Sequence, residues 1–208
     1  MTTSVAERAH WEAVYAAKPP AALSWYAPRL DASLALIECA APDRGAAILD
    51  AGGGASTLVD DLLARGYRGL TVLDLSSAAL AAARLRLGAA AARVRWLQAD
   101  LTRAPFAPRA FDLWHDRAVF HFLASASARR AYVEHLMRAL KPGGELILAT
   151  FAPEGPPRCS GLPVARYDAA ALARELGAGF RLLQAVTALH HTPTGARQPF
   201  LYCRFRAA

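Results

Sequence analysis

The sequence predicts an α/β fold in which helices cover both faces of a mostly parallel sheet. Between Ala47 and Phe151, short apolar strands alternate with helical segments, and such alternation implies parallel strands joined by right-handed crossovers. A glycine-rich turn follows the first strand, and an acidic residue stands at or near the end of each of the first three strands. Because ligands of these sheets bind at the carboxyl ends of the strands, the turn and the acids predict a ligand site at that edge.

The composition limits the class of protein. The 208 residues, 54% hydrophobic and 20% charged, fit one folded domain, which we expect to span 1–208. No apolar run approaches the roughly 20 residues that cross a bilayer, and the first residues lack the apolar core of a signal peptide. We therefore expect a cytoplasmic protein with no membrane partner.

Cysteine, histidine and charge patterns argue against several kinds of site. Cys39, Cys159 and Cys203 are too few and too widely spaced for a disulfide framework or a zinc site. Adjacent His190 and His191 would point to opposite faces of a strand, so we expect no metal. The net charge of +7 comes from scattered arginines, and we do not expect a nucleic acid partner.

The N-terminal part predicts two helices that flank an aromatic segment. Apolar residues among charges indicate a helix over 5–18, which a pair of prolines ends. Trp25 and Tyr26 follow in an irregular segment. A second helix is predicted over 31–41, with Asp31 as its N-cap.

The middle and the end of the chain supply the sheet and its crossovers. Five strands are predicted to end near Ala51, Leu73, Gln98, His115 and Phe151. Helices are predicted over 56–65, 77–88 and 127–140. After them we expect a long loop over 152–163, a helix over 168–176, a strand over 180–187, a turn over 190–195 and a last strand over 199–206.

The glycine-rich turn is the most specific local signal. It reads Asp50-Ala51-Gly52-Gly53-Gly54-Ala55-Ser56-Thr57. Glycines let the backbone turn sharply beside a ligand, and the helix that follows presents free amides. The dinucleotide fingerprint needs a third glycine where this chain has Thr57, so that fingerprint is incomplete.

Asp74 is the second signal, because it ends the next strand about 20 residues after the turn. An acid at this place accepts hydrogen bonds from ribose hydroxyls, in NAD and S-adenosylmethionine (SAM) alike. It therefore indicates a nucleoside ligand without choosing between the two.

The pattern Asp50-x-Gly52-x-Gly54-x-Ser56 resembles the first motif of the class I SAM-dependent methyltransferases, with Ser56 at the place of the last glycine. The turn Leu140-Lys141-Pro142-Gly143-Gly144 is also similar to one common in that family. The resemblance implies a Rossmann-like α/β fold with a seven-stranded, mostly parallel sheet, an antiparallel last strand and an N-terminal helical lid. It divides the chain into a lid over 1–42, a SAM-binding core over 43–151 and a part over 152–208 with the substrate loop, a helix and a hairpin.

The resemblance also implies the residues that hold SAM. In the family, an acid after the third strand accepts from the adenine amino group and its apolar neighbour lies against the ring, and Asp100 and Leu101 match them. The implied cofactor-binding residues are Asp50, Gly52, Gly53, Gly54, Ser56, Thr57, Asp74, Leu75, Ser76, Asp100, Leu101 and His115.

Residues just past the fourth strand flank the transferred methyl group in this family. An acid or an imidazole there is able to take a proton from a nucleophile, so His115 and Asp116 are implied as catalytic residues. The implied substrate contacts are Trp25, Tyr26, Arg29, Phe120, His121 and Cys159, and Trp11 and Tyr15 are further candidates for the lining. The alternatives are that the aromatic side chains only pack the helices onto the sheet and that Asp116 forms a local cap.

The implied function is methyl transfer from SAM, with S-adenosylhomocysteine (SAH) as product, to a small-molecule thiol, amine, carboxylate or metalloid. A protein lysine is the alternative acceptor, because His10-Trp11-Glu12-x-x-Tyr15 resembles a subgroup that includes lysine methyltransferases of elongation factor and citrate synthase. An NAD(P) oxidoreductase and a SAM-binding protein without catalysis are the two other classes. The sequence leaves open the acceptor atom and the choice between a monomer and a homodimer.

Overall fold

The computed structural model describes residues 3–208, so residues 1–2 of the expected lid lie outside the described part. Its centre is a sheet of seven strands: β1 (Ala47–Ala51), β2 (Gly69–Asp74), β3 (Arg95–Gln98), β4 (Phe111–Arg117), β5 (Leu140–Phe151), β8 (Phe180–His191) and β9 (Arg197–Ala207). Six α-helices surround it: α1 (Thr3–Ala17), α2 (Asp31–Ala40), α3 (Leu58–Ala64), α4 (Ser77–Leu87), α5 (Ala126–Ala139) and α6 (Ala169–Leu176). Shorter elements are the 3-10 helices η1 (Pro20–Ala22), η2 (Gly88–Arg93) and η3 (Phe120–Phe122) and the hairpin of β6 (Arg158–Cys159) and β7 (Leu162–Pro163).

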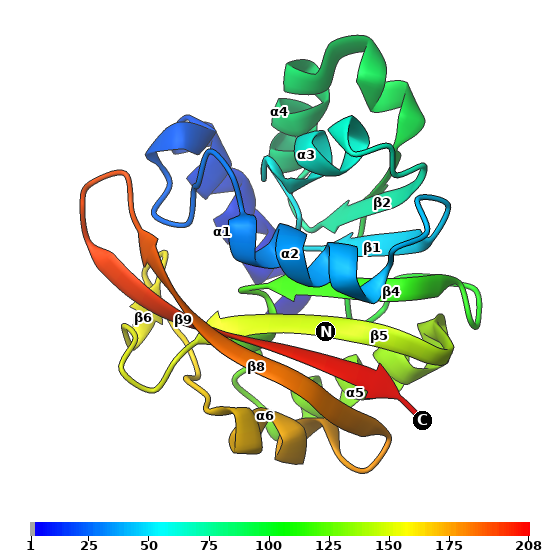
Figure 1. Ribbon diagram of the computed structural model, residues 1–208. Helices are drawn as coiled ribbons and strands as arrows, with labels where there is room; N and C mark the ends of the chain where they lie inside the picture. Colours follow the sequence, from blue (N-terminus) through cyan, green and yellow to red (C-terminus); the bar gives the residue numbers. More distant parts are fainter. Residues whose placement is uncertain (1–2) are drawn as a thin grey trace.

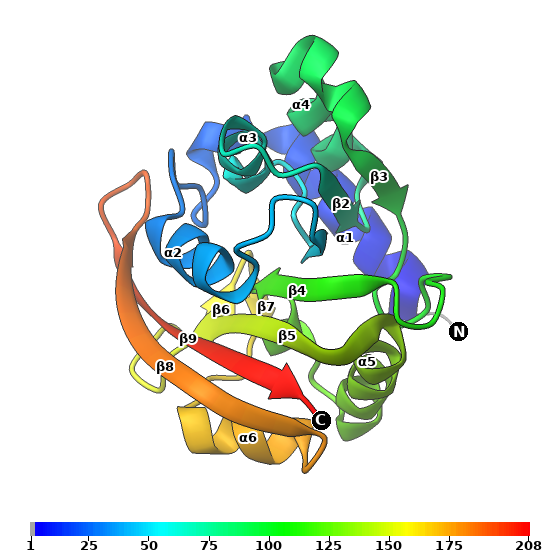
Figure 2. The ribbon, with the colours of Figure 1, turned by 45° about the vertical axis from the view of Figure 1, so that its right-hand side comes forward.

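The strands follow the order β3-β2-β1-β4-β5-β9-β8, from one edge of the sheet to the other (Figures 1 and 2). All neighbouring pairs from β3 to β5 are parallel, whereas β9 runs antiparallel to both β5 and β8. This confirms the predicted seven-stranded, mostly parallel sheet with an antiparallel last strand. The order reverses between β1 and β4, and that is where such sheets bind ligands.

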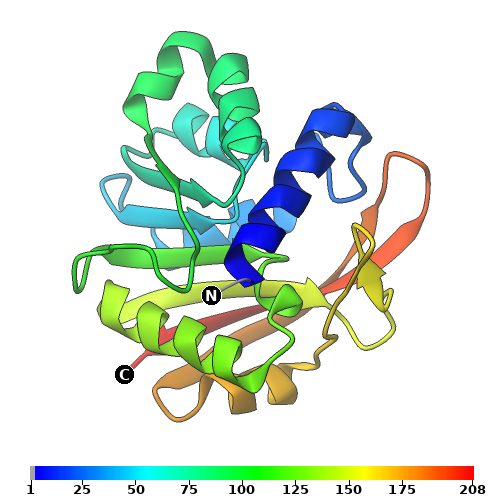
Figure 3. The same cartoon turned by 180° about the vertical axis from the view of Figure 1, so that it is seen from behind.

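Two layers of helices bury the two faces of the sheet. Helices α2 and α3 pack on one face, in a cluster that includes Leu58, Leu113 and Ile147, and α5 and α6 pack on the other, around Trp114 (Figures 1 and 3). The parallel strands read as near-continuous apolar runs because both of their faces are covered. Trp114 is fully buried, and its indole N–H donates to the hydroxyl of Tyr132 over 3.1 Å.

The boundaries of several elements differ from those expected. Asp31 was expected to cap α2, but the helix begins at Asp31 itself, and no side chain caps its first turn. The Asp31 carboxylate pairs instead with the exposed Arg29 over 2.7 Å, so that expectation was wrong. Asp168 does cap α6, because its carboxylate accepts from the Ala171 amide over 2.7 Å.

The C-terminal hairpin is longer than expected, and it changes the place of the two histidines. His190 and His191 were expected in the turn, but β8 continues through both and pairs with Gln198 and Arg197 of β9. The turn lies at 192–196, where the Thr192 amide donates to the Ala196 carbonyl. The expected loop over 152–163 also contains the β6–β7 hairpin.

The described residues contain no helix that is both long and apolar enough to span a membrane.

Candidate active site

A cavity of about 270 Å³ lies at the carboxyl ends of β1, β2, β3 and β4, beside α1. One part of its lining comes from the strand ends and the glycine-rich turn, and we call it the glycine half: Gly52, Asp74, Leu75, Asp100 and Leu101. The other part comes from α1, the segment before α2, the exit of β4 and the β6–β7 hairpin, and we call it the aromatic half: Trp11, Trp25, Arg117, Phe122 and Cys159. Tyr15 also lines the cavity.

The turn after β1 depends on glycine at two positions. Gly52 has φ +68°, and a Cβ there would lie 2.0 Å from Cγ2 of Val119. Gly54 has φ +44°, and a Cβ there would lie 2.7 Å from Oδ2 of Asp74 and 2.9 Å from the Tyr15 hydroxyl. Both positions combine a backbone region that disfavours side chains with a close neighbour, so only glycine fits without rearrangement.

Gly52 lines the cavity, but Gly54 and the remaining residues of the turn do not, and several of them hold the turn in place. The Gly53 amide donates to the Leu73 carbonyl over 3.1 Å. The Ser56 hydroxyl accepts from the Leu58 amide over 3.2 Å, and the Thr57 hydroxyl donates to the Ala27 carbonyl over 3.0 Å. Thr57 therefore ties the turn to the segment that carries Trp25.

Asp74 is buried at the end of β2 and lines the cavity with Leu75. Its Oδ1 accepts from the Ser76 amide over 2.8 Å. Burial raises the pKa of this carboxyl to about 7, although the hydrogen bond from Ser76 works in the other direction. Ser76 is itself buried and caps α4, because its hydroxyl accepts from the Ala79 amide over 3.1 Å.

Glu12 of α1 holds that helix against the N-terminus of α4, and the sequence reasoning missed this role. Its carboxylate accepts from the Ser77 amide over 2.7 Å and from the Ala78 amide over 3.1 Å. It also accepts from the hydroxyls of Ser76 and Ser77, each over 2.8 Å. Burial alone would raise the pKa of Glu12, but these hydrogen bonds lower it to about 2. No short motif marks a contact between elements so distant in sequence.

Asp100 and Leu101 line the cavity after β3. Oδ1 of Asp100 accepts from the Thr102 amide over 2.9 Å and from the Thr102 hydroxyl over 2.7 Å. Glu7 of α1 lines the same region, and burial and the nearby Asp100 raise its pKa. The two acids that end β2 and follow β3 are thus brought together, as the sequence predicts.

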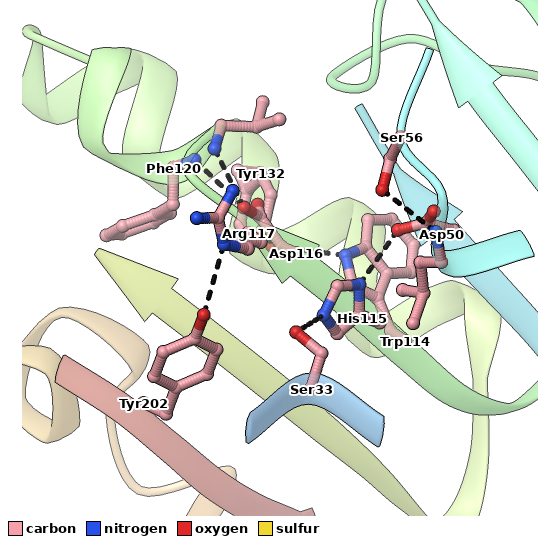
Figure 4. A network of polar contacts seen from close by, with 12 residues as sticks. Ser33, Asp50, Ser56, Trp114, His115, Asp116, Arg117, Phe120, Tyr132 and Tyr202 are labelled. Atoms are coloured by element: carbon pink, nitrogen blue, oxygen red, sulfur yellow. Dashed lines mark hydrogen bonds and ion pairs between the residues drawn. The ribbon is translucent and has the colours of Figure 1, made fainter. Parts of the chain in front are cut away.

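His115 does not line the cavity, contrary to the expectation that it acts there. Its Nδ1 lies 2.8 Å from Oδ1 of Asp50, and its Nε2 lies 2.9 Å from the Ser33 hydroxyl of α2 (Figure 4). Both ring nitrogens are therefore engaged, and the side chain is buried between β1 and α2. Asp50 is likewise absent from the lining. These two residues join the strands on which the cavity is built.

Asp116 is also committed to the protein rather than to the cavity. One oxygen accepts from the amides of Val119, over 2.9 Å, and Phe120, and the other accepts from the Tyr132 hydroxyl over 2.8 Å (Figure 4). The side chain is fully buried, and burial raises its pKa to about 6. It fixes the exit of β4, as the alternative of a local cap describes, and it does not line the cavity.

Arg117 and Ala118 line the cavity in place of their two predecessors. The side chain of Arg117 reaches β9, where its Nε–H donates to the Tyr202 hydroxyl over 3.0 Å (Figure 4). Ala118 has φ +71°, a region that L-residues rarely adopt, and its amide donates to the Ala149 carbonyl.

Aromatic rings from distant segments meet around the aromatic half. The ring of Trp11 lies edge-on to Trp25 at 5.8 Å and to Phe122 at 5.1 Å between centroids. Tyr15 lies edge-on to Trp25 at 6.1 Å. The candidates Trp11, Tyr15 and Trp25 are therefore brought together at the cavity.

Four expected substrate contacts do not line the cavity: Tyr26, Arg29, Phe120 and His121. Phe120 is buried against Tyr132, and His121 is buried against Phe122 and Phe151. Burial and the charge of Arg117 lower the pKa of His121 to about 3, so its ring stays neutral. Of the expected contacts, Trp25 and Cys159 do line it, and burial raises the pKa of the Cys159 thiol to about 11.

Apart from the carboxyl groups of Glu7, Asp74 and Asp100, the described lining offers binding surfaces but no poised proton acceptor. Burial raises the pKa values of Tyr15 and Tyr132, as it does that of Cys159, so none of these groups is ionised near neutral pH. Within residues 3–208, no three His, Cys, Asp or Glu side chains are grouped as metal ligands. A concave lining that is mostly apolar and carries a few polar groups is typical of a small-molecule site.

Comparisons with known proteins point to one family and fold. Residues 48–144 match the sequence model of a methyltransferase domain. The chain is also 30% identical, over 121 residues, to the ubiquinone/menaquinone biosynthesis C-methyltransferase UbiE of Dinoroseobacter shibae. That alignment covers 57% of this chain and 47% of the relative, so the match spans about half the length of the relative.

Solved structures are similar over nearly the whole chain. A protein of echinomycin biosynthesis, studied for the conversion of a disulfide bond into a thioacetal group, superposes with a TM-score of 0.75 at 25% identity, covering 97% of this chain and 92% of that one. The 1,6-didemethyltoxoflavin-N1-methyltransferase of Burkholderia thailandensis, solved with 1,6-didemethyltoxoflavin and SAH bound, superposes with a TM-score of 0.73 at 19% identity. The superposition covers 100% of this chain and 92% of that one, and it shows a similar fold.

Proposed function

We infer that the chain is a class I SAM-dependent methyltransferase, and we propose that it transfers a methyl group from SAM to a small-molecule acceptor. One observation carries the proposal. A single cavity joins Gly52 of the glycine-rich turn and the acids at the ends of β2 and β3 to an aromatic half that includes Trp11, Trp25 and Phe122. The named relatives act on small molecules, which supports an acceptor of that class for this chain.

The glycine half fits SAM by the groups that it presents. Its carboxylates are hydrogen-bond acceptors, and apolar side chains stand beside them. The Asp74 carboxylate would accept hydrogen bonds from the ribose hydroxyls, and Asp100 would accept from the adenine amino group, with Leu75 and Leu101 against the ring. When bound, SAM supplies an electrophilic methyl group on a sulfonium.

The protein's own contribution is proximity and exclusion of water. Trp11, Trp25 and Phe122 would hold the acceptor next to the methyl group. Positioning of this kind makes a bimolecular reaction effectively unimolecular and so raises its rate. His115 and Asp116, whose polar atoms are engaged elsewhere, act as positioning residues for β1, α2 and the exit of β4. In this proposal neither residue acts as the base, and the carboxyl groups of Asp74 and Asp100 are assigned to the cofactor.

A protein lysine is the alternative acceptor. The guanidinium of Arg117 in the aromatic half disfavours it, because an approaching ammonium would meet a like charge. The SAM-binding protein without catalysis differs from both in one observable, which is the absence of turnover with any acceptor.

Thermal unfolding in the presence of SAH, SAM and NADPH tests the cofactor. A ligand at about 100 times its dissociation constant should add about 2.7 kcal/mol to the free energy of unfolding. We expect SAH and SAM to raise the unfolding temperature and NADPH to leave it unchanged. A shift with NADPH alone would contradict the proposal.

Transfer of a labelled methyl group from SAM to a panel of thiols, amines, carboxylic acids and metalloid oxyanions tests the acceptor. Product from at least one small acceptor supports the proposal. Labelling of a purified cellular protein without any labelled small molecule would favour the lysine alternative, and SAH binding without turnover on either panel would favour a non-catalytic role.

A further inference from the structure

We propose that the methyl acceptor carries a negative charge and that Arg117 is the residue that selects it. This inference rests on the proposed function and adds the chemical class of the acceptor. It is based on the guanidinium of Arg117, which has no carboxylate partner in residues 3–208.

Arg117 lines the cavity without an ionic partner in residues 3–208. Its side chain forms none of the ion pairs found in this part of the chain, whereas Arg86, Arg129 and Arg206 each have a carboxylate within 3 Å. A half-buried guanidinium without a counter-ion is costly, because it loses water without gaining an opposite charge. An anionic ligand would supply that charge.

The guanidinium is held in a fixed orientation by neutral groups. Its Nε–H donates to the Tyr202 hydroxyl over 3.0 Å, and one NH1 hydrogen donates to the Trp25 carbonyl over 3.1 Å. The ring of Phe200 lies 4.6 Å below it. Two of the five N–H groups of an arginine are thus used, and three remain to bind an anion.

The charges along the lining are divided between its two halves. Asp74 and Asp100 lie in the glycine half, and Glu7 lies close to Asp100. Arg117 is the only basic residue among the described residues of the lining, and it extends toward β9, away from β2 and β3. An anion is therefore favoured at the acceptor's end of the cavity and disfavoured at the other.

The chemistry of the cavity agrees with an acceptor that arrives ionised. The carboxyl groups of the lining, Glu7, Asp74 and Asp100, lie toward the glycine half. Near the aromatic half, burial keeps Tyr15, Tyr132 and Cys159 protonated, so none of them is poised to remove a proton. A cation beside a thiol, phenol or carboxylic acid lowers its pKa and increases its nucleophilic form. Arg117 would thus replace a general base by stabilising the deprotonated acceptor.

Titration calorimetry on the full chain, saturated with SAH, tests this with three probes of one shape. Benzoate, benzamide and benzylamine share a ring and differ in charge. We expect benzoate to bind at least about tenfold more tightly than benzamide, and benzylamine to bind most weakly. Equal affinities for benzoate and benzamide in the wild-type protein would overturn the proposal.

Variants assign the preference to Arg117. R117Q should lose the preference for benzoate while it still binds SAH, and R117K, which keeps the charge, should retain part of it. R84Q is the matched control, because Arg84 is an exposed arginine of α4 and its loss should leave both affinities unchanged. If R117Q weakens SAH tenfold or more and benzoate not at all, Arg117 serves the cofactor and the proposal is wrong. If R117Q does not fold, the proposal is judged by the ratio of benzoate to benzamide affinity in the wild-type protein and in R117K.

SAH binding separates this inference from the proposed function. A wild-type protein that binds SAH but does not prefer benzoate contradicts the anionic acceptor alone. A protein that does not bind SAH contradicts the methyltransferase proposal, and with it the present one.

Discussion

The two halves of the cavity are built by different means. In the glycine half, every lining residue lies within three positions of the end of β1, β2 or β3, so the sheet itself places each group. In the aromatic half, Trp11, Trp25, Arg117 and Cys159 come from four separate segments. The first half follows from the register of parallel strands, whereas the second exists only when α1, the segment before α2, the exit of β4 and the β6–β7 hairpin have packed together.

The two halves also obtain the same backbone conformation from different residues. Gly52 has φ +68°, and Ala118, at the exit of the neighbouring strand β4, has φ +71°. Glycine adopts this region at no steric cost, whereas alanine adopts it only with steric strain. The glycine half is thus relaxed at its turn, and the aromatic half stores strain at the exit of β4.

The largest effect is expected from Asp74→Ala, which would break the glycine half alone. Loss of a charged acceptor of two ribose hydrogen bonds should weaken SAH binding by about 3 kcal/mol, or more than about 100-fold. Titration calorimetry measures the change. Asp31→Ala is the control, since Asp31 is exposed and pairs only with Arg29. Equal losses for both variants would contradict the assignment.

A second variant, Gly52→Ala, tests the contact at which the two halves meet. The new Cβ would lie 2.0 Å from Cγ2 of Val119, and the free energy of unfolding should fall by about 2 kcal/mol. Gly66→Ala is the control, because Gly66 has φ +85° with nothing near a Cβ, and it should cost only about 1 kcal/mol. Chemical denaturation measures both. If Val119→Ala does not restore part of the loss in Gly52→Ala, the contact is not its cause.

The pH dependence of SAH binding should show that an ionised carboxylate is needed in the glycine half. Asp74 must be ionised to accept from both ribose hydroxyls, and its pKa is raised to about 7. Affinity should therefore fall as the pH falls through 7, by about tenfold between pH 8 and pH 6, which is about 1.4 kcal/mol. In Asp74→Asn the residue no longer titrates, so the same titrations should give a flat profile. A profile that is unchanged in this variant would point to another group.

The smallest effect is expected from Ala118→Gly, which would remove the strain of the aromatic half. Glycine at φ +71° should raise the free energy of unfolding by about 1 kcal/mol. Ala107→Gly is the control in an exposed loop without positive φ, and it should lower stability. Denaturation midpoints compare the two, and a loss of stability in Ala118→Gly would argue against strain.

The contrast between the halves also explains which predictions from sequence succeeded. Strand ends, a glycine turn and acids at fixed spacing place Gly52, Asp74 and Asp100 at one edge, and the structure brings them to one cavity. The fold followed from the same alternation of strands and helices. Local patterns sufficed because each of these residues depends mainly on its own strand.

Predictions for the other half failed where packing decides. His115 and Asp116 stand at the correct strand end, but their side chains are taken up by Asp50, Ser33 and Tyr132. Arg29 pairs with a neighbour in sequence, and Arg117, one position beyond the expected pair, takes the place at the cavity. The identity of these partners depends on side chains that lie far away along the chain, and no local pattern encodes it.

The contact of Glu12 with the N-terminus of α4 has a consequence for linkage. Helix α1 carries Glu7, Trp11 and Tyr15 to the cavity, and Glu12 joins this helix to the rest of the protein through four hydrogen bonds. If docking of α1 raises the affinity for SAH by some factor, SAH must favour docking by that same factor. Amide hydrogen exchange in α1 would then slow when SAH occupies the cavity. Binding of the ligand would stabilise the docked helix to the same extent as the docked helix stabilises binding.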